Sequence, residues 1–167
     1  KLYLGDCLEA MGRLIEQNIV VDMILCDPPY GTTQCKWDII IPFDEMWQRL
    51  NKLIKPNGAI VLFGSEPFSS ALRMSNISNY KYDLIWCKER PSNPALAKKR
   101  PLKYTEYIHL FYKKQPTYNP QKTEGKPYKA KSGETTSSNF GKFNGNHHTE
   151  NKDGKRCPLT VLNFSGE

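Results

Sequence analysis

The chain has 167 residues, of which 38% are hydrophobic, and a mean hydropathy of −0.62. This length suits one domain with a real core, and no apolar run approaches the roughly 20 residues of a membrane span. The net charge of +7 is uneven: residues 1–87 hold 8 basic and 10 acidic side chains, residues 88–131 hold 12 and 3, and residues 132–167 hold 4 of each. The middle segment therefore predicts a polyanionic partner, although a basic surface can also serve solubility alone.

The cysteines favour a reduced, cytoplasmic protein with unpaired thiols. Their number is odd, none forms a C-x-x-C pair, and two lie in apolar runs. They are Cys7, Cys26, Cys35, Cys87 and Cys157.

The N-terminal residues predict a short strand followed by a helix. The strand is the apolar piece 2–4, which ends at Gly5. Asp6 and Glu9 resemble a capping box, and apolar residues then recur at helical spacing. Asp6 is therefore placed at a strand-to-helix junction, where it acts as a cap, a ligand contact, or both.

The stretch 21–31 reads V-D-M-I-L-C-D-P-P-Y-G and carries the main functional signal. Its apolar half predicts a fully buried strand of a parallel sheet at 21–26. Pro28 and Pro29 fix φ and lack N–H donors, so the chain leaves the strand in a stiff turn with free carbonyl acceptors. Open α/β sheets bind their ligands at such strand ends.

The groups in this turn suit a planar exocyclic amine on a nucleic-acid base. The Asp27 carboxylate and the Pro28 carbonyl can accept its two hydrogens, which frees the nitrogen lone pair to attack a methyl group. Tyr30 can stack on the base once it is flipped out of the duplex. The alternative is a Pro-rich turn with Asp27 as a turn residue, which the preceding strand and the following Tyr-Gly make less attractive.

Alternating helices and strands follow. Residues 32–41 predict a loop over the site, in which Trp37 is either a core anchor or part of a flap. We expect a helix at 43–54, a turn at 55–58, a strand at 59–63 and a helix that Ser65 caps. Further strands are predicted at 82–86, 105–112 and 161–164. This alternation is typical of a doubly wound α/β sheet.

The remaining segments point to nucleic acid. Residues 88–103 predict a basic loop for phosphate contacts or for a guanine edge, with candidates Lys88, Arg90, Lys98, Lys99, Arg100 and Lys103. Residues 116–157 are polar and poor in aliphatics, which fits either disorder or a target-recognition region. His147 and His148 with Cys157 match no zinc pattern, so no metal is expected.

Asp27-Pro28-Pro29-Tyr30 resembles the catalytic motif of the DNA amino methyltransferases, which methylate adenine N6 or cytosine N4 with S-adenosylmethionine. Segments 4–8, 55–66 and 113–120 resemble this family too. The order of segments is similar to its permuted β-class, in which the catalytic half precedes a glycine-rich cofactor half.

The resemblance implies an α/β fold: a Rossmann-like methyltransferase sheet with helices on both faces, here incomplete, plus a basic irregular recognition segment. Residues 1–115 would be the catalytic half, 116–160 the target-recognition region and 161–167 a last strand. The implied catalytic residues are Asp27, Pro28, Pro29 and Tyr30. The implied cofactor-binding residues are Asp6, Cys7, Asp27 and Pro28.

The resemblance also implies partners. Double-stranded DNA is the expected substrate, with adenine N6 favoured because Asp precedes Pro-Pro-Tyr; a homodimer and a cognate restriction enzyme are compatible with it. The alternatives are a cytosine N4 enzyme, an RNA amino methyltransferase, and a non-catalytic binder left by a phage or mobile element. The family's glycine-rich loop is expected beyond Phe164, so 167 residues alone should bind S-adenosylmethionine weakly or not at all.

Overall fold

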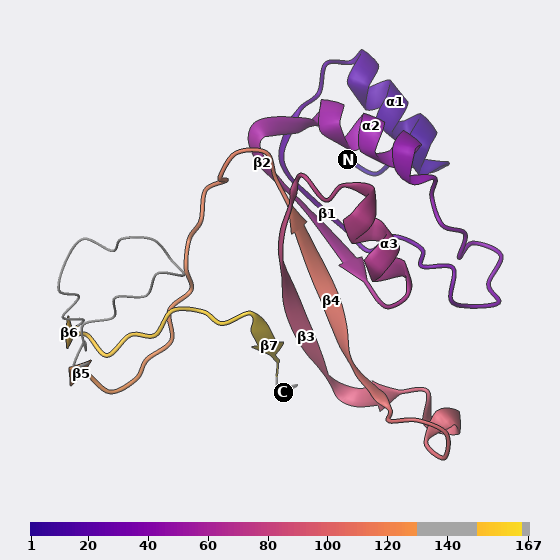
Figure 1. The fold of residues 1–167 in the computed structure, drawn as a ribbon. Helices are drawn as coiled ribbons and strands as arrows, with labels where there is room; N and C mark the ends of the chain where they lie inside the picture. The colour runs from indigo at the N-terminus through magenta and orange to yellow at the C-terminus, as the bar shows by residue number, and fades with distance from the viewer. Residues whose placement is uncertain (130–149, 165–167) are drawn as a thin grey trace. The chain divides into compact units, whose positions relative to one another are not determined.

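The computed structural model describes residues 1–129 and 150–164, and the chain divides into two compact units. The first unit comprises Lys1–Thr117 with Thr160–Glu167 and contains a five-stranded sheet and three α-helices (Figure 1). The second comprises Tyr118–Leu159 and contains the small sheet of β5 (Tyr128–Lys129) and β6 (Glu150–Asn151).

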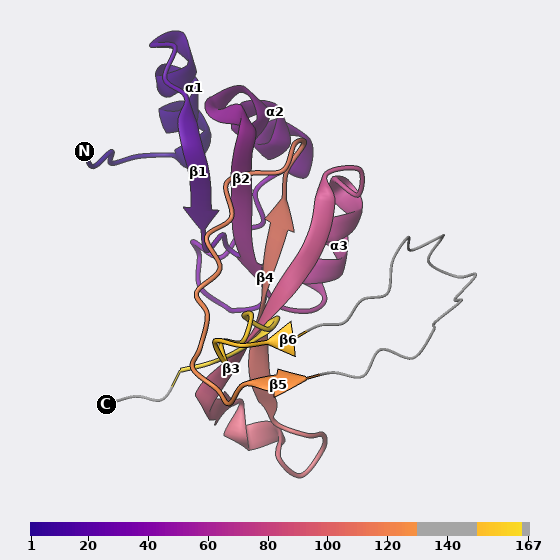
Figure 2. The same cartoon turned by 90° about the vertical axis from the view of Figure 1, so that its left-hand side faces the viewer.

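The larger sheet is mixed, with the strand order β1-β2-β4-β3-β7. β1 pairs with β2 and β3 pairs with β7 in parallel, whereas β4 runs antiparallel to both β2 and β3. The carboxyl ends of β1, β2 and β3 therefore share one edge of the sheet (Figure 2). The strands are β1 (Val21–Cys26), β2 (Ile54–Gly64), β3 (Tyr80–Ser92), β4 (Lys103–Phe111) and β7 (Val161–Asn163).

Three α-helices cover one face of this sheet: α1 (Cys7–Glu16), α2 (Phe43–Leu53) and α3 (Phe68–Ser75). Apolar residues of α2 and α3 meet alternate residues of β2 and the end of β4 in one core, because side chains along a strand alternate between its two faces. The core consists of Met46, Trp47, Leu50, Ile60, Leu62, Phe68, Leu72 and Phe111. The α/β class is confirmed, but within the described residues the expected helices are found on one face only.

The burial predicted for β1 is wrong, although its bounds are confirmed. Met23 and Leu25 keep 56% and 59% of their surface exposed. β1 is the last strand at its side of the sheet, and these two side chains lie on the face opposite Ile24, which is partly buried against the core. The strand predicted at 2–4 is also wrong, since residues 1–4 form no strand and Leu2 and Leu4 are fully exposed.

Two predicted boundaries shift at β2. The strand begins at Ile54, so the predicted turn 55–58 is part of it. At the other end, Ser65 does not cap α3 with its side chain; its hydroxyl contacts the Lys103 ammonium instead. The Glu66 carboxylate takes the expected capping role, because it accepts a hydrogen bond from the backbone N–H of Ser70 at 3.2 Å.

β3 and β4 form a long hairpin whose tip replaces part of the predicted basic loop. β3 extends to Ser92, and a short 3-10 helix at Pro94–Leu96 follows Asn93, which adopts a left-handed φ of 62°. Because β2 and β3 are parallel, this tip projects from the same edge of the sheet at which β1 ends.

The second unit is held by contacts of its own. Thr123 and Arg156 exchange backbone hydrogen bonds of 3.1 and 2.8 Å, and the Arg156 guanidinium lies 4.6 Å from the centre of the Tyr128 ring. His147 and His148 lie outside the described residues. Among residues 1–129 and 150–164, no helix is long and apolar enough to cross a bilayer, and no His, Cys, Asp and Glu side chains cluster as metal ligands.

Candidate active site

The turn after β1 joins a carboxylate to an aromatic ring. Asp27 is exposed, and the Tyr30 hydroxyl donates a hydrogen bond to its Oδ1 at 2.5 Å. The Tyr30 ring is half-buried and stacks on Phe68 of α3, with ring centres 5.2 Å apart. Pro28 is buried beneath the turn, and no hydrogen bond among the described residues uses its carbonyl. One Asp27 oxygen and one backbone carbonyl thus remain as acceptors.

The electrostatics of the turn keep Tyr30 protonated. Burial raises the pKa of Tyr30 well above its usual range, and the hydrogen bond to Asp27 raises it further. The charge of Glu106, on β4, raises the pKa of Tyr30 as well. Tyr30 therefore serves as a donor to Asp27 and not as a base.

Asp38 organises the loop that follows. Its carboxylate accepts hydrogen bonds of 2.7–2.8 Å from the backbone N–H groups of Gly31, Thr32 and Thr33. Burial would raise the pKa of Asp38, but these donors and the Thr33 hydroxyl outweigh it and lower the pKa to about 2. Trp37, by contrast, is 72% exposed and is no core anchor. Gly31 has a φ of +66°, which a non-glycine residue rarely adopts.

The predicted cofactor residues belong to two elements: Asp27 and Pro28 follow β1, and Asp6 and Cys7 stand at the start of α1. Asp6 caps α1: its Oδ1 accepts from the N–H groups of Leu8 and Glu9 at 2.8 and 3.1 Å. Partial desolvation raises the pKa of Cys26, and the charge of Asp27 adds to this rise. Carboxylates beside a backbone carbonyl that no donor in the described part of the chain uses suit a cationic sulfonium with a polar adenosine, so these groups fit S-adenosylmethionine.

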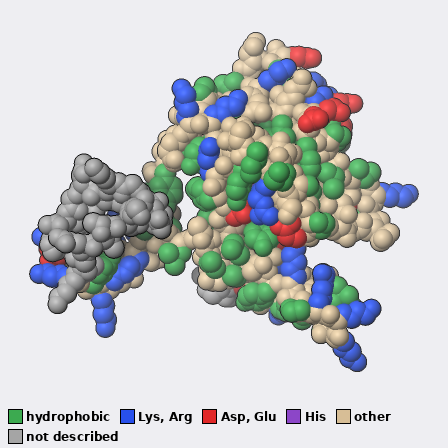
Figure 3. All heavy atoms as spheres, in the orientation of Figure 1, with side chains coloured by type: hydrophobic (Ala, Val, Ile, Leu, Met, Phe, Trp, Pro, Cys, Tyr) green, Lys and Arg blue, Asp and Glu red, His purple; other side chains and the backbone are tan. Residues whose placement is uncertain are grey.

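The predicted DNA-binding residues separate into two groups. Arg90, Lys98, Lys99 and Arg100 are exposed, and Figure 3 shows Lys and Arg side chains gathered at the hairpin tip. Lys88 and Lys103 are half-buried and contact other side chains of the fold. Lys88 bonds Glu106 and lies 5.5 Å from the centre of the Trp86 ring, and Lys103 contacts Ser65.

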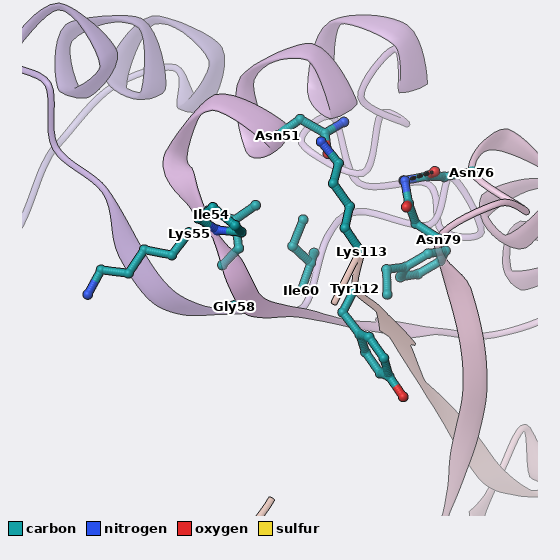
Figure 4. Close-up of a pocket in the computed structure, with 11 residues that line it drawn as sticks. Asn51, Ile54, Lys55, Gly58, Ile60, Asn76, Asn79, Tyr112 and Lys113 are labelled. Atoms are coloured by element: carbon teal, nitrogen blue, oxygen red, sulfur yellow. Dashed lines mark hydrogen bonds between the residues drawn. The ribbon is translucent and has the colours of Figure 1, made fainter. Parts of the chain in front are cut away.

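A cavity of about 150 Å³ lies at the opposite edge of the sheet. Its lining includes Ile54 and Gly58 at the start of β2 and Phe111 at the end of β4. Figure 4 shows Lys113 extended across it toward Asn51. Asp27 does not line this cavity, so the cavity is separate from the turn after β1.

Sequence reasoning missed several polar residues near the turn. Two of them, Glu106 and His109, lie on β4, and Asp83 lies on β3; the apolar pattern predicts both strands. The fourth is Ser69, which follows Phe68, the residue whose ring stacks on Tyr30. The available signal was the polar residue inside the apolar run Tyr-Ile-His-Leu-Phe, because a strand that buries histidine has to supply hydrogen-bond partners for it.

Comparison with known proteins agrees with this geometry. The model of a protein family described as DNA methylase matches residues 21–161, so the chain belongs to the N6/N4 DNA amino-methyltransferase family. The crystal structure of an M1.HpyAVI-SAM complex is 26% identical with a TM-score of 0.56, over 75% of this chain and 62% of that one.

A second structural relative is PvuII DNA methyltransferase, described as cytosine-N4-specific. It is 14% identical with a TM-score of 0.54, over 99% of this chain and 57% of that one. At this identity the likeness concerns the fold alone. This chain spans about three fifths of the length of these two structures.

Proposed function

We propose that this chain is the catalytic part of a DNA methyltransferase that methylates the N6 amino group of an adenine flipped from a specific sequence. The observation that carries the proposal is the exposed Asp27 carboxylate, bonded to Tyr30, at the carboxyl end of β1 in a sheet of this family. The cofactor of the proposed reaction is S-adenosylmethionine, as the M1.HpyAVI-SAM relative suggests.

The proposed role of Asp27 and Pro28 is to hold the amine. An exocyclic amine is a weak nucleophile, because its lone pair is delocalised into the ring. Two acceptors aimed at its two hydrogens favour a tetrahedral nitrogen and localise that lone pair. Asp27 has an oxygen beyond the one that Tyr30 occupies, and the Pro28 carbonyl has no donor among the described residues. Preorganised acceptors of this kind need no rearrangement during the reaction.

The proposed transfer is direct. S-adenosylmethionine supplies an electrophilic methyl group, and the amine nitrogen forms the new bond to carbon as the bond to sulfur breaks. Asp27 is placed to accept the proton that the nitrogen then loses. No covalent bond to the protein forms.

The proposed role of Tyr30 is to support the flipped base. One face of its ring packs on Phe68, so a base would stack on the opposite face. Stacking on an aromatic side chain contributes about 1–3 kcal/mol per base. The hydrogen bond to Asp27 fixes the ring and the carboxylate relative to each other before the base arrives.

The proposed role of the hairpin tip is to hold the DNA backbone. Arg90, Lys98, Lys99 and Arg100 are exposed at the edge where β1 ends, which suits phosphate contacts that position the duplex. Lys88 and Lys103 contact other protein side chains. We therefore assign them mainly a structural role at the site and only a secondary role in DNA binding.

Single-molecule sequencing of DNA from cells that express the gene tests the proposal. We expect N6-methyladenine at one sequence motif, and none in cells that carry Asp27→Ala. N4-methylcytosine at a motif would move the assignment to cytosine, and methylated ribosomal RNA with unmodified DNA would move it to RNA. The absence of any modified base in both strains would contradict the proposal.

A further inference from the structure

A buried set of polar side chains connects α3 to the sheet beside the catalytic turn. The Ser69 hydroxyl lies 2.8 Å from His109 Nε2, and His109 Nδ1 lies 2.6 Å from Asp83 Oδ1. Ser69 and His109 are both 0% exposed. We call these three side chains the Ser69–His109–Asp83 relay.

The relay has the order of groups found in serine hydrolases, but it is closed to substrates. No surface of the Ser69 side chain is accessible, and β2 passes directly over the Ser69–His109 contact. A Cβ atom on Gly64 would lie only 2.6 Å from both His109 Nε2 and Ser69 Oγ. The hydroxyl therefore cannot reach an ester or amide, and the relay acts on its own surroundings.

Further contacts connect Asp83 to the start of α3. Asp83 Oδ2 bonds Arg73 at 2.9 Å, and Arg73 bonds Glu66 Oε1 at 2.6 Å. Glu66 in turn accepts from the Ser70 hydroxyl at 2.7 Å. Side chains from β3, β4 and α3 thus fix the first turn of this helix.

The first turn of α3 also carries the support for Tyr30. Phe68 is 3% exposed, directly precedes Ser69 and stacks on the Tyr30 ring. The Tyr30 hydroxyl contacts Asp27. One continuous set of contacts therefore runs from His109 through α3 to the carboxylate at the end of β1.

We propose that the Ser69–His109–Asp83 relay positions the catalytic turn: it fixes the first turn of α3, so that Phe68 holds the Tyr30 ring with its hydroxyl on Asp27. The proposal rests on the function proposed for Asp27 and Tyr30. Apolar contacts tolerate sliding, whereas a fully bonded buried network allows one arrangement. Methyl transfer needs this accuracy, because a 1 Å misplacement can cost about a hundredfold in rate.

A pair of serines on α3 provides a matched test. Ser69→Ala breaks the relay at the first turn. Ser75→Ala breaks a comparable hydrogen bond at the last turn, where the Ser75 hydroxyl accepts from Trp47 Nε1 at 2.7 Å. Both variants remove one hydroxyl with a buried partner, but Ser69 is fully buried and Ser75 is itself exposed, so Ser69→Ala should lower the melting temperature more than Ser75→Ala.

Their effects on the turn should differ. In NMR spectra of this chain, we expect Ser69→Ala to shift the Tyr30 ring protons, which Phe68 shields, and Ser75→Ala to leave them unchanged. In the active enzyme, we expect Ser69→Ala to lower kcat at least about tenfold with little change in the KM for DNA, and Ser75→Ala to change kcat less than about twofold. His109→Gln should repeat the Ser69→Ala pattern.

The outcomes separate the two proposals. An inactive wild-type enzyme would contradict the proposed function, whereas the Tyr30 resonances would still report on the relay. Unchanged Tyr30 resonances in Ser69→Ala, or equal losses of kcat in Ser69→Ala and Ser75→Ala, would overturn the relay as a positioning device.

Discussion

At the scale of single residues, Asp6 is the clearest case of a side chain with two expected roles. Its Oδ1 caps α1 through two backbone N–H groups, which confirms the predicted cap. The resemblance to the amino methyltransferases implies a second role, as a contact to the cofactor. A substitution that keeps a cap and removes the carboxylate can separate these roles.

Substitutions of Asp6 should show both roles. We expect Asp6→Ala to cost about 1 kcal/mol of stability, because an N-cap is lost. Asp6→Ser should keep most of that stability, since serine is also a good cap, yet both variants should raise the KM for S-adenosylmethionine. Thermal melts and initial rates measure the two effects. A normal KM in Asp6→Ser would reduce Asp6 to a helix cap.

Asp38 is a residue that the sequence pattern did not single out, since only Trp37 was considered, as either a core anchor or part of a flap. The loop 32–41 was predicted correctly as irregular, and its large aromatic, Trp37, drew attention as an anchor. The anchor is the neighbouring Asp38, which bonds three successive backbone N–H groups. A loop can be held by a packed aromatic ring or by a carboxylate that bonds its backbone. Which of the two occurs depends on the path of the backbone, and amino-acid composition does not give that path.

The loop around Asp38 should depend on pH. The pKa of Asp38 is about 2 in the folded protein and near 4 in an unfolded chain, so its stabilisation is complete above about pH 4 and is lost as the pH falls toward 2. We expect Asp38→Asn to melt below the wild type at pH 7, with the difference shrinking between pH 4 and 2. Asp44→Asn, at an exposed site on α2, is the control. A difference that persists at pH 2 would contradict this.

At the scale of elements, sequence periodicity placed the helices and central strands and misjudged their ends and burial. The bounds of β1 were predicted correctly from its apolar run. An apolar strand is fully buried, however, only if other elements cover both of its faces and a neighbouring strand pairs with each of its edges. β1 lies at the side of the sheet, so Met23 and Leu25 are exposed. The turn predicted from Lys55 to Gly58 lies within β2 as an irregularity, because β1 pairs first with Ile54 and next with Ala59 and leaves residues 55–58 between the two pairs.

Two glycines test how tightly the elements pack. Gly64→Ala should cost about 1–3 kcal/mol, because its Cβ would clash with His109 and Ser69 across the contact of β2 with α3. Gly12→Ala should instead add about 0.5–1 kcal/mol, since Gly12 lies inside α1 with nothing within 4 Å of the new methyl group. Chemical denaturation measures both values. A neutral Gly64→Ala would mean that the strand and helix are looser than the structure describes.

At the scale of the whole molecule, the chain combines a net acidic segment, residues 1–87, with a basic excess in residues 88–131. This excess can be found from the sequence alone. Which of the basic side chains are exposed, and which bond other side chains of the protein, cannot. Lys88 meets Glu106 across the hairpin, and Lys103 meets Ser65 just after β2. Both contacts depend on strand register. The relay was unpredictable for the same reason: 40 residues separate Ser69 from His109.

The exposed cations should determine how salt affects DNA binding. The triple substitution of Lys98, Lys99 and Arg100 by alanine should lower the slope of log K against log salt by about 2–3, since each phosphate contact contributes roughly 0.9. Lys113→Ala with Lys114→Ala, at the opposite edge of the sheet, should have little effect. Fluorescence anisotropy at several salt concentrations provides the slopes. Equal slopes for the wild type and the triple variant would remove the hairpin tip from the DNA interface.

Asp27 carries the proposed chemistry, and single-turnover methyl transfer to a DNA duplex measures its role directly. We expect Asp27→Ala to lower the rate at least about a thousandfold and to change the Kd for DNA less than about threefold. Asp22→Ala removes an exposed carboxylate from the same strand, where it bonds Lys55 at 2.7 Å, and should keep nearly the full rate. An Asp27→Ala enzyme that transfers methyl groups within tenfold of the wild-type rate would contradict the account.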